Sequence, residues 1–569
     1  MVRLWHDPSP GRWPPSPRST RGEGLLTFSL PRSELSSPSP LQGEKVPEGR
    51  MRGRATGQVR VLSMFFALFL FAFTARAAVT TTALTGRVTA GNTPAAGVTV
   101  SVTSPALQHP RTVTTNAHGF YWIAALPPGV YEVSFSRTGL SSLIRPALLE
   151  LGRVARADAR LDVNEDEDSV TSTAIPMSVV DDPVLTSHFD DGELDRLPLP
   201  LGRLSAAPFA PGPLDGPLLI DDVPVETMPF LGYEVVEQLT VFRGAMPLDF
   251  ADHNAIVART RSGGEQFTLS IRDTYFDGEG HLVESASGGS IVSERLWFFA
   301  GGWGGVTDGV NVKLTGQPGA SHNFVATYLD ADGESVAALR YTGIATERLT
   351  AEAIVTTEGF ANARASYVYG AHVLTGGASD EALYASDRWS RGRFAVVAGL
   401  RFDDDQTSSR VAASYDVRGN GRQALTASFG RYAHTLDIFT AGFATAIGST
   451  GTGRLDYLRR ERENELQLDV RYSLFGRLQT GGGYTYNDSA AFGHRGHAWV
   501  GAELPLGEHE IGATLLERYE RDAWASDLAF RYTLPLPHFR MTLGADVTNA
   551  FQAAAAEPRG WRAWLRARL

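Results

Sequence analysis

The sequence contains no cysteine among its 569 residues. This absence excludes a thiol nucleophile, a cysteine-ligated zinc site and a disulfide framework. Oxidising compartments favour disulfides, but they do not require them. The lack of cysteine therefore limits the chemistry of the protein without arguing against its secretion.

Positive charge is also in short supply, because 52 Lys and Arg residues stand against 63 Asp and Glu residues and the formal net charge is −11. We find no basic face or stripe of the kind that binds nucleic acid. Hydrophobic residues reach 43%, so disorder over most of the chain is not expected. Glycine (59 residues) and aromatic residues (10%) are plentiful, which is typical of many short strands joined by tight turns.

Catalytic motifs are missing as well. The sequence has no GxSxG, HExxH, P-loop or usable dinucleotide fingerprint. The HxxE spacing of His281 and Glu284, the pair His494 and His497, and the acidic run 403–405 are more simply explained as strand and turn residues than as metal ligands. We therefore predict that the protein is not an enzyme and that it holds neither a metal nor another cofactor.

The only intensely apolar run is Met64 to Phe73, and it is about ten residues long, half of what a spanning helix needs. Arginines precede it, and Ala75 and Ala77 supply the small residues that a signal peptidase reads. Residues 51–77 are thus predicted to be a signal peptide cleaved after Ala77. Residues 1–50 are predicted to be disordered or untranslated, with Met51 or Met64 as the true start. Any insertion into a membrane must then occur through strands.

Residues 78–163 alternate in polarity with a period of two, and turn signals separate the short runs, which predicts an antiparallel β-sandwich. The segments LTGRVTAGNTPAAGVTVSV and TTNAHGFYWIAALPPGVYEVSF resemble the carboxypeptidase regulatory-like domain, a transthyretin-like sandwich. The family pattern is carried by Gly86, Gly97, Gly119, Gly129 and Tyr131. The resemblance implies an accessory domain rather than a catalytic one.

Residues 164–264 contain three short motifs in a fixed order, LLIDDVP, EVVEQLTVFRG and VARTRSGG. This order resembles the plug domain of TonB-dependent outer-membrane receptors, although the plug is shorter and a valine replaces the usual isoleucine of the second motif. Residues 167–171 (EDSVT) are the one candidate for a TonB box. We predict a reduced plug whose motif residues are Asp221, Asp222, Glu234, Glu237, Arg243 and Gly244.

The charged residues of the second plug motif allow two interpretations. Glu234, Glu237 and Arg243 could tie the plug to a barrel wall, where a buried charge must be paired. Alternatively, they could be solvated turn charges.

Residues 265–569 form repeated runs with one apolar and one polar face, which predicts a C-terminal transmembrane antiparallel β-barrel of about 18–22 strands. The final segment, from Trp561 to Leu569, alternates most cleanly, as expected for a strand that the barrel-assembly machinery reads. At 22 strands little chain is left for loops. The longest candidate ligand loop is 434–454, with Phe439 and Phe443.

The sequence thus predicts an all-β protein of the cell outer membrane with its N-terminal domains in the periplasm. Its resemblance to TonB-dependent receptors implies transport of an unidentified small ligand, with outer-membrane lipid and the TonB energy-transducing complex as partners. The alternative is a structural or adhesive barrel that does not transport. A soluble secreted multi-domain β protein and a peptidase accessory protein are further alternatives.

Overall fold

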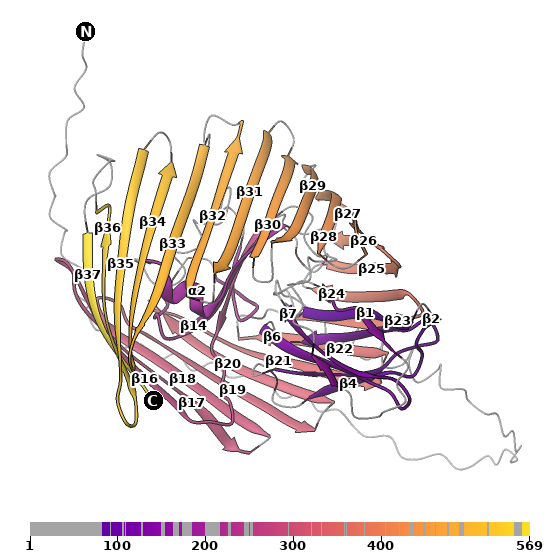
Figure 1. Cartoon of the computed structure of the whole chain (residues 1–569), viewed down its shortest axis with the longest axis horizontal. Coiled ribbons are helices and arrows are strands. Elements are labelled where there is room, and N and C mark those ends of the chain that lie inside the picture. The colour runs from indigo at the N-terminus through magenta and orange to yellow at the C-terminus, as the bar shows by residue number, and fades with distance from the viewer. Residues whose placement is uncertain are drawn as a thin grey trace, which may run out of the picture. The chain divides into compact units, whose positions relative to one another are not determined.

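The computed structural model describes the chain from residue 82 to residue 569 with gaps, of which the longest are 163–169, 173–184, 200–216 and 551–559. Nearly all of the described residues lie in strands or in the turns between them (Figure 1). The one helix in this part of the chain is α2 (Asp191–Arg196). Across the described residues, no helix has both the length and the apolar character that a membrane span requires.

The first strands form two five-stranded sheets. One sheet has the order β2-β1-β5, with β8 and β9 also paired to β1, and the other has the order β10-β7-β6-β3-β4. The bounds of the first sheet are β1 (Thr82–Ala90), β2 (Thr93–Pro94), β5 (Phe120–Leu126), β8 (Val154–Arg156) and β9 (Ala159–Leu161). Those of the second are β3 (Thr99–Thr103), β4 (Arg111–Thr114), β6 (Gly129–Ser136), β7 (Ser142–Leu149) and β10 (Val170–Ser172).

Buried side chains from both sheets form one apolar core, which the alternating pattern predicted. Tyr121 lies inside this core and its hydroxyl donates to the carbonyl of Ala157 at 2.7 Å, so the buried phenol has a partner. Gly86 must lack a side chain, because a Cβ there would overlap the same Ala157 carbonyl. Gly119 adopts a φ of +70°, which L side chains rarely adopt.

A third sheet has the order β11-β14-β15-β12-β13. Its strands are β11 (Leu185–Phe189), β12 (Leu218–Ile220), β13 (Val223–Val225), β14 (Val236–Arg243) and β15 (Asn254–Thr260). Helix α2 follows β11 directly. We call this sheet, helix α2 and the described segments that connect them the plug.

The remaining 22 strands form a closed antiparallel barrel, β16 to β37, in which every strand pairs with its neighbours in sequence. Closure is completed by β16 and β37, whose register runs from Ser270 opposite Arg568 to Phe276 opposite Arg562. The strands are β16 (Thr268–Phe276), β17 (Gly280–Val292), β18 (Leu296–Gly305), β19 (Gly309–Gly319), β20 (His322–Ala331), β21 (Glu334–Thr346), β22 (Leu349–Thr356), β23 (Ala361–Tyr369), β24 (His372–Ser379), β25 (Ala382–Arg391), β26 (Phe394–Asp403), β27 (Gln406–Asp416), β28 (Gln423–Tyr432), β29 (Leu436–Ile447), β30 (Gly451–Arg460), β31 (Glu463–Leu474), β32 (Leu478–Asn487), β33 (His494–Leu506), β34 (His509–Glu520), β35 (Ala523–Pro535), β36 (Arg540–Thr548) and β37 (Gly560–Arg568).

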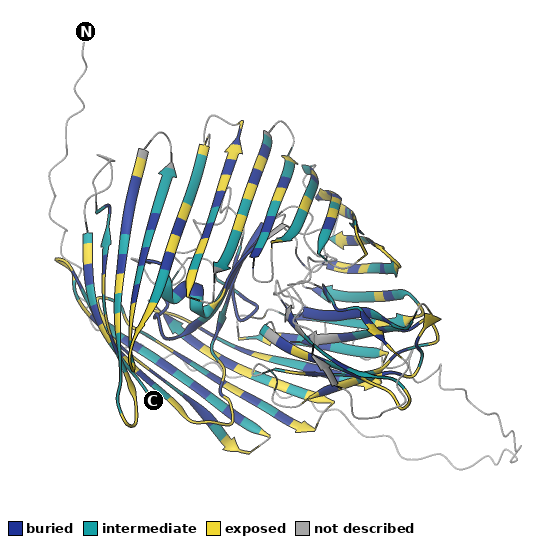
Figure 2. Cartoon of the chain, viewed as in Figure 1, coloured by how far each residue is buried: buried dark blue, intermediate teal, exposed yellow. Residues whose placement is uncertain are grey.

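Figure 2 shows buried and exposed residues alternating along the barrel strands. Large apolar residues are the exposed ones and many polar residues are the buried ones, so the wall is apolar outside and polar inside. On β31, Leu466 and Leu468 are each 43% exposed. The polar residues that alternate with them, Glu465 and Gln467, are buried. A strand that buries its charges and exposes its leucines is stable only where lipid covers the outer face. The predicted transmembrane barrel therefore agrees with the structure, at the upper end of the expected strand number.

Replacing a lipid-facing leucine at mid-strand tests this arrangement. We expect Leu468→Arg on β31 to destabilise the folded barrel by about 2–4 kcal/mol, because a charge at the bilayer midplane must leave water. The same change at the strand end, Leu506→Arg on β33, should cost about 1 kcal/mol or less. Urea unfolding in lipid vesicles, followed by heat-modifiable gel mobility, measures both. Equal costs at the two positions would contradict a spanning barrel.

Candidate functional site

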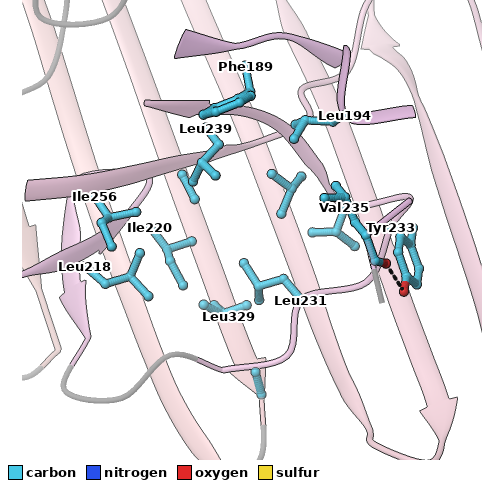
Figure 3. Packing of buried hydrophobic residues seen from close by; sticks show 14 of the residues in the cluster. Phe189, Leu194, Leu218, Ile220, Leu231, Tyr233, Val235, Leu239, Ile256 and Leu329 are labelled. Carbon is cyan, nitrogen blue, oxygen red and sulfur yellow. Dashed lines mark hydrogen bonds between the residues drawn. The ribbon is translucent and has the colours of Figure 1, made fainter. Parts of the chain in front are cut away.

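The plug shares its apolar core with the barrel wall. Figure 3 shows Phe189, Leu239, Ile220 and Ile256 from the plug strands in one buried cluster that also includes Leu329 of β20. Wall residues from several other strands join the same cluster, namely Leu282, Trp303, Val336, Ile354, Trp499 and Leu516. The plug is therefore packed against the wall, and its charged residues meet the wall in a water-poor interface.

Asp221 and Asp222 form the two-residue turn between β12 and β13, with φ of 50° and 74°. Aspartate tolerates this left-handed conformation better than most residues. The turn directs both carboxylates at the wall, where Asp221 lies 2.9 Å from Lys313 Nζ of β19 and Asp222 lies 2.5 Å from Arg340 of β21. Burial alone would raise the pKa of Asp221, but Lys313 and the Thr260 hydroxyl hold it below its usual value.

Glu234 binds both strands that close the barrel. Its carboxylate accepts from Ser270 Oγ at 2.7 Å and lies 4.0 Å from Arg272, both on β16. It also lies 3.4 Å from Arg566 and 3.2 Å from Arg568, on β37. Burial alone would raise the pKa of Glu234, yet Arg566 and Arg568 lower it to about 2. One plug carboxylate is therefore shared among three arginines across the closing seam.

Tyr233, the residue before this glutamate, contacts Arg272 as well and one further arginine, Arg562. The guanidinium groups of Arg272 and Arg562 lie 4.2 Å and 4.8 Å from the centre of its ring, which is close enough for cation–π attraction. The Tyr233 hydroxyl donates to the carbonyl of Leu199 at 2.9 Å, the bond drawn in Figure 3. Arg562 also donates to both oxygens of this pair. Tyr233 and Glu234, two neighbouring residues of the plug, therefore both bind arginines of β37.

Helix α2 supplies the third group of contacts. Asp190 caps its first turn by accepting from the Glu193 N–H at 2.8 Å. Glu193 then lies 2.8 Å from Arg471 of β31, and Asp195 lies 3.0 Å from Arg566 of β37. Burial raises the pKa of Glu193 to about 7, although Arg471 opposes the shift. The short helix is therefore bound to two separate wall strands, β31 and β37.

The other predicted plug residues have different outcomes. Glu237 lies half-buried on β14, and burial raises its pKa while Arg261 opposes the rise. It forms no ion pair with any residue that the structure describes. The backbone of Arg243 ends β14, but its side chain and the whole of Gly244 lie outside the described residues, as do Ala75 and Ala77 of the predicted cleavage site.

The predicted ligand loop 434–454 is wrong as a loop. Phe439 and Phe443 lie on β29, paired opposite Phe429 and Leu425 of β28. Both rings are exposed, and they share the outward face of the wall with other apolar residues. The Gly- and Thr-rich composition suggested a loop, but the alternation of large and small residues supports a strand whose aromatic side chains face lipid.

The candidate TonB box lies partly within strand β10. Residues 167–169 are outside the described part of the chain. Val170, Thr171 and Ser172 pair in parallel with Ser142, Leu143 and Ile144 of β7, at the edge of the second sandwich sheet.

Sequence reasoning missed the wall partners of the plug. Lys313, Arg340 and Arg471 lie at the polar positions of their alternating strands. That pattern predicted only that the inside of the barrel is polar, and it did not indicate a partner for any of these residues. The alternating polar face of the final strand, Arg562, Arg566 and Arg568, was visible in the sequence. An unusual density of arginine in a lumen-facing register could have indicated that acidic plug residues lie opposite.

Removing the Glu234 charge should loosen the plug. We expect Glu234→Ala to cost about 3–5 kcal/mol, because its three arginine neighbours would lose a buried counter-charge. Glu132→Gln, at an exposed position of β6, is the control and should have almost no effect. Limited proteolysis of the purified protein in detergent, with mass spectrometry of the plug fragments, reports the change. Unchanged cleavage rates in the alanine variant would contradict this role.

The same carboxylate predicts how the plug responds to acid. Because the folded pKa of about 2 lies below the ordinary value of 4.5, the contribution of Glu234 is complete above about pH 4.5 and is lost as the pH falls toward 2. The loss amounts to about 3 kcal/mol. Proteolysis with an acid-active protease should show the wild type approaching Glu234→Gln over this range. A difference between the two proteins that does not vary with pH would contradict the assignment.

Comparisons with known proteins agree with this architecture. Residues 83–162 match the carboxypeptidase regulatory-like domain family. The chain is 27% identical over 265 residues to the TonB-dependent transporter Oar of Myxococcus xanthus, a match that covers 37% of this chain and 25% of that protein. The chain thus spans only about a quarter of the length of this relative.

Solved structures share the fold at low sequence identity. The ferric preacinetobactin receptor BauA of Acinetobacter baumannii is 10% identical with a TM-score of 0.54, covering 70% of this chain and 98% of that one. The ferric-catecholate import receptor Fiu of E. coli K12 has the same identity and TM-score, covering 68% and 97%. The siderophore receptor PirA of Pseudomonas aeruginosa is 14% identical with a TM-score of 0.52, covering 68% and 99%. The chain thus has the barrel fold of these outer-membrane receptors, carries an N-terminal carboxypeptidase regulatory-like domain, and is similar in sequence to a TonB-dependent transporter.

Proposed function

We propose that the protein carries an unidentified small ligand across the outer membrane when the TonB complex displaces its plug. The observation that carries the proposal is the bonding of the plug to the wall. Asp221, Asp222 and Glu234 each meet lysine or arginine of the wall across a buried interface. A buried ion pair adds little net stability compared with an apolar contact, because its groups are solvated well once water enters. Such contacts can be broken and remade.

The arrangement of the chain supports a periplasmic position for the N-terminal domains. The number of barrel strands is even, so the start of β16 and the end of β37 lie at the same rim. The plug therefore enters from the rim that carries the C-terminus. In bacterial outer-membrane barrels this rim faces the periplasm, where TonB acts. The alternating final strand is the segment that we expect the barrel-assembly machinery to bind.

A second candidate is a structural or adhesive barrel that does not transport. The short connections between strands favour it, because ligand capture usually depends on long loops. Under this alternative the plug would be a fixed filling for the barrel, and TonB would have no binding segment. The two candidates therefore differ in one measurable contact.

A pull-down with the periplasmic domain of TonB distinguishes the candidates. We expect the wild-type protein in detergent to be retained. Thr171→Pro should reduce retention about tenfold or more, because proline removes an N–H that a strand partner needs. Thr171→Ser keeps that N–H and serves as the control.

The outcomes of this experiment separate two failures. Equal retention of the wild type and the proline variant would show that TonB binds elsewhere on the chain. No retention of the wild type would refute energised transport and favour the structural barrel.

A further inference from the structure

A small polar cavity of about 200 Å³ lies between helix α2 and the inner face of strands β33 to β37. Its lining includes Gly192 and Asp195 from the helix and the lumen-facing residues of the wall strands. It lies at the rim where β33 turns into β34, where β35 turns into β36 and where β37 ends. Pockets for drug-sized ligands measure about 300–1,000 Å³, so this cavity fits a small ion or one group of a larger solute.

The lining of the cavity carries more positive than negative charge. Five arginines and three carboxylates line it. Two of these carboxylates are already bound, because Asp195 lies 3.0 Å from Arg566 and Glu503 lies 3.2 Å from Arg196 and 3.5 Å from Arg531. The third, Glu510, is exposed and forms no ion pair with a described residue. The lining therefore has two more positive than negative groups.

The strand register concentrates this excess at one point. Arg540, at the start of β36, lies directly opposite Arg568 on β37, and both line the cavity. Like charges in directly opposed positions of neighbouring strands destabilise the pairing. Arg568 is compensated by Glu234 at 3.2 Å, whereas Arg540 has no ion pair or side-chain hydrogen bond within the described chain. An anion in the cavity would remove this repulsion.

Arginine is suited to that role because its planar fork of N–H donors matches the oxygens of phosphate and carboxylate groups. Arg531 lines the cavity from β35, and Thr533 of β35 and Thr542 of β36, whose hydroxyls hydrogen-bond to each other at 3.2 Å, leave one hydroxyl hydrogen to donate. The cavity thus combines guanidinium and hydroxyl donors around a volume that suits an oxyanion.

We propose that this cavity is an oxyanion-binding site, with Arg540 as its principal ligand-binding residue and Arg531 as a second. Its ligand is a multivalent oxyanion of the phosphate type, either free or as a group on a larger solute. The site requires neither a moving plug nor TonB, so it stands or falls independently of the proposed transport.

Calorimetric titration of the full-length protein in detergent at low ionic strength tests the proposal, with inorganic phosphate and glycerol 3-phosphate as separate probes. We expect wild-type protein to bind at least one probe and Arg540→Gln to bind it at least tenfold more weakly. Arg459→Gln is the matched control, because Arg459 is exposed on the outward parity of β30 and should leave binding unchanged. Binding of the ester alone would assign the site to a group on a larger solute, and binding of both would assign it to phosphate in general.

A second variant separates recognition from structural damage. Glu510→Gln removes the unpaired carboxylate from the lining, so we expect phosphate to bind several-fold more tightly. A folding defect would weaken binding instead. The proposal is overturned if the wild type binds neither probe, or if Arg540→Gln binds as tightly as the wild type.

Discussion

The hydrogen bonding of the backbone in lipid is the constraint on which this structure depends. Hydrocarbon offers no partner for an unpaired N–H or carbonyl group, so strands can cross a membrane only when the sheet closes on itself. Here closure is the antiparallel pairing of β16 with β37, the first and last strands of the barrel. Because side chains alternate along each strand, a closed wall that exposes leucine to lipid must direct its charges inward. The lumen is charged as a direct consequence of closure.

Those inward charges explain how the plug is held. A barrel of 22 strands encloses far more space than its own side chains fill, and the plug occupies part of it. Asp221 and Asp222 each pair with a basic residue of the wall, and Glu234 is shared among three arginines. Glu234 has a special position because its arginine partners come from both strands of the closing seam. The plug and the closure of the barrel are therefore energetically coupled at one carboxylate.

The same seam leads to the oxyanion site. Arg566 and Arg568 form ion pairs with Glu234 of the plug. The same two arginines also line the cavity, beside residues of β36. Two roles thus meet on one strand: the residues that hold the plug are also next to the excess positive charge. A ligand group in the cavity would lie beside α2, close to contacts that the plug must break if it moves.

The alternating runs, the turns and the absence of long apolar segments were sufficient to predict an all-β chain with a sandwich and a strand-built membrane domain, whereas the plug was predicted from the resemblance of its motif order to that of a known family. Periodicity determines these features because it specifies which face of a strand is apolar, and that information is local. Composition misled at residues 434–454, where small residues suggested a loop and the chain instead continues as β29 and β30.

Motif order identified Asp221 and Glu234 as residues of interest, but not what they bind. Their partners Lys313, Arg340, Arg566 and Arg568 lie up to several hundred residues away, and only the register of the closed barrel brings them together. Which charge faces which is decided by closure and by the seating of the plug, because an ion pair depends on distance in space and not on spacing along the chain.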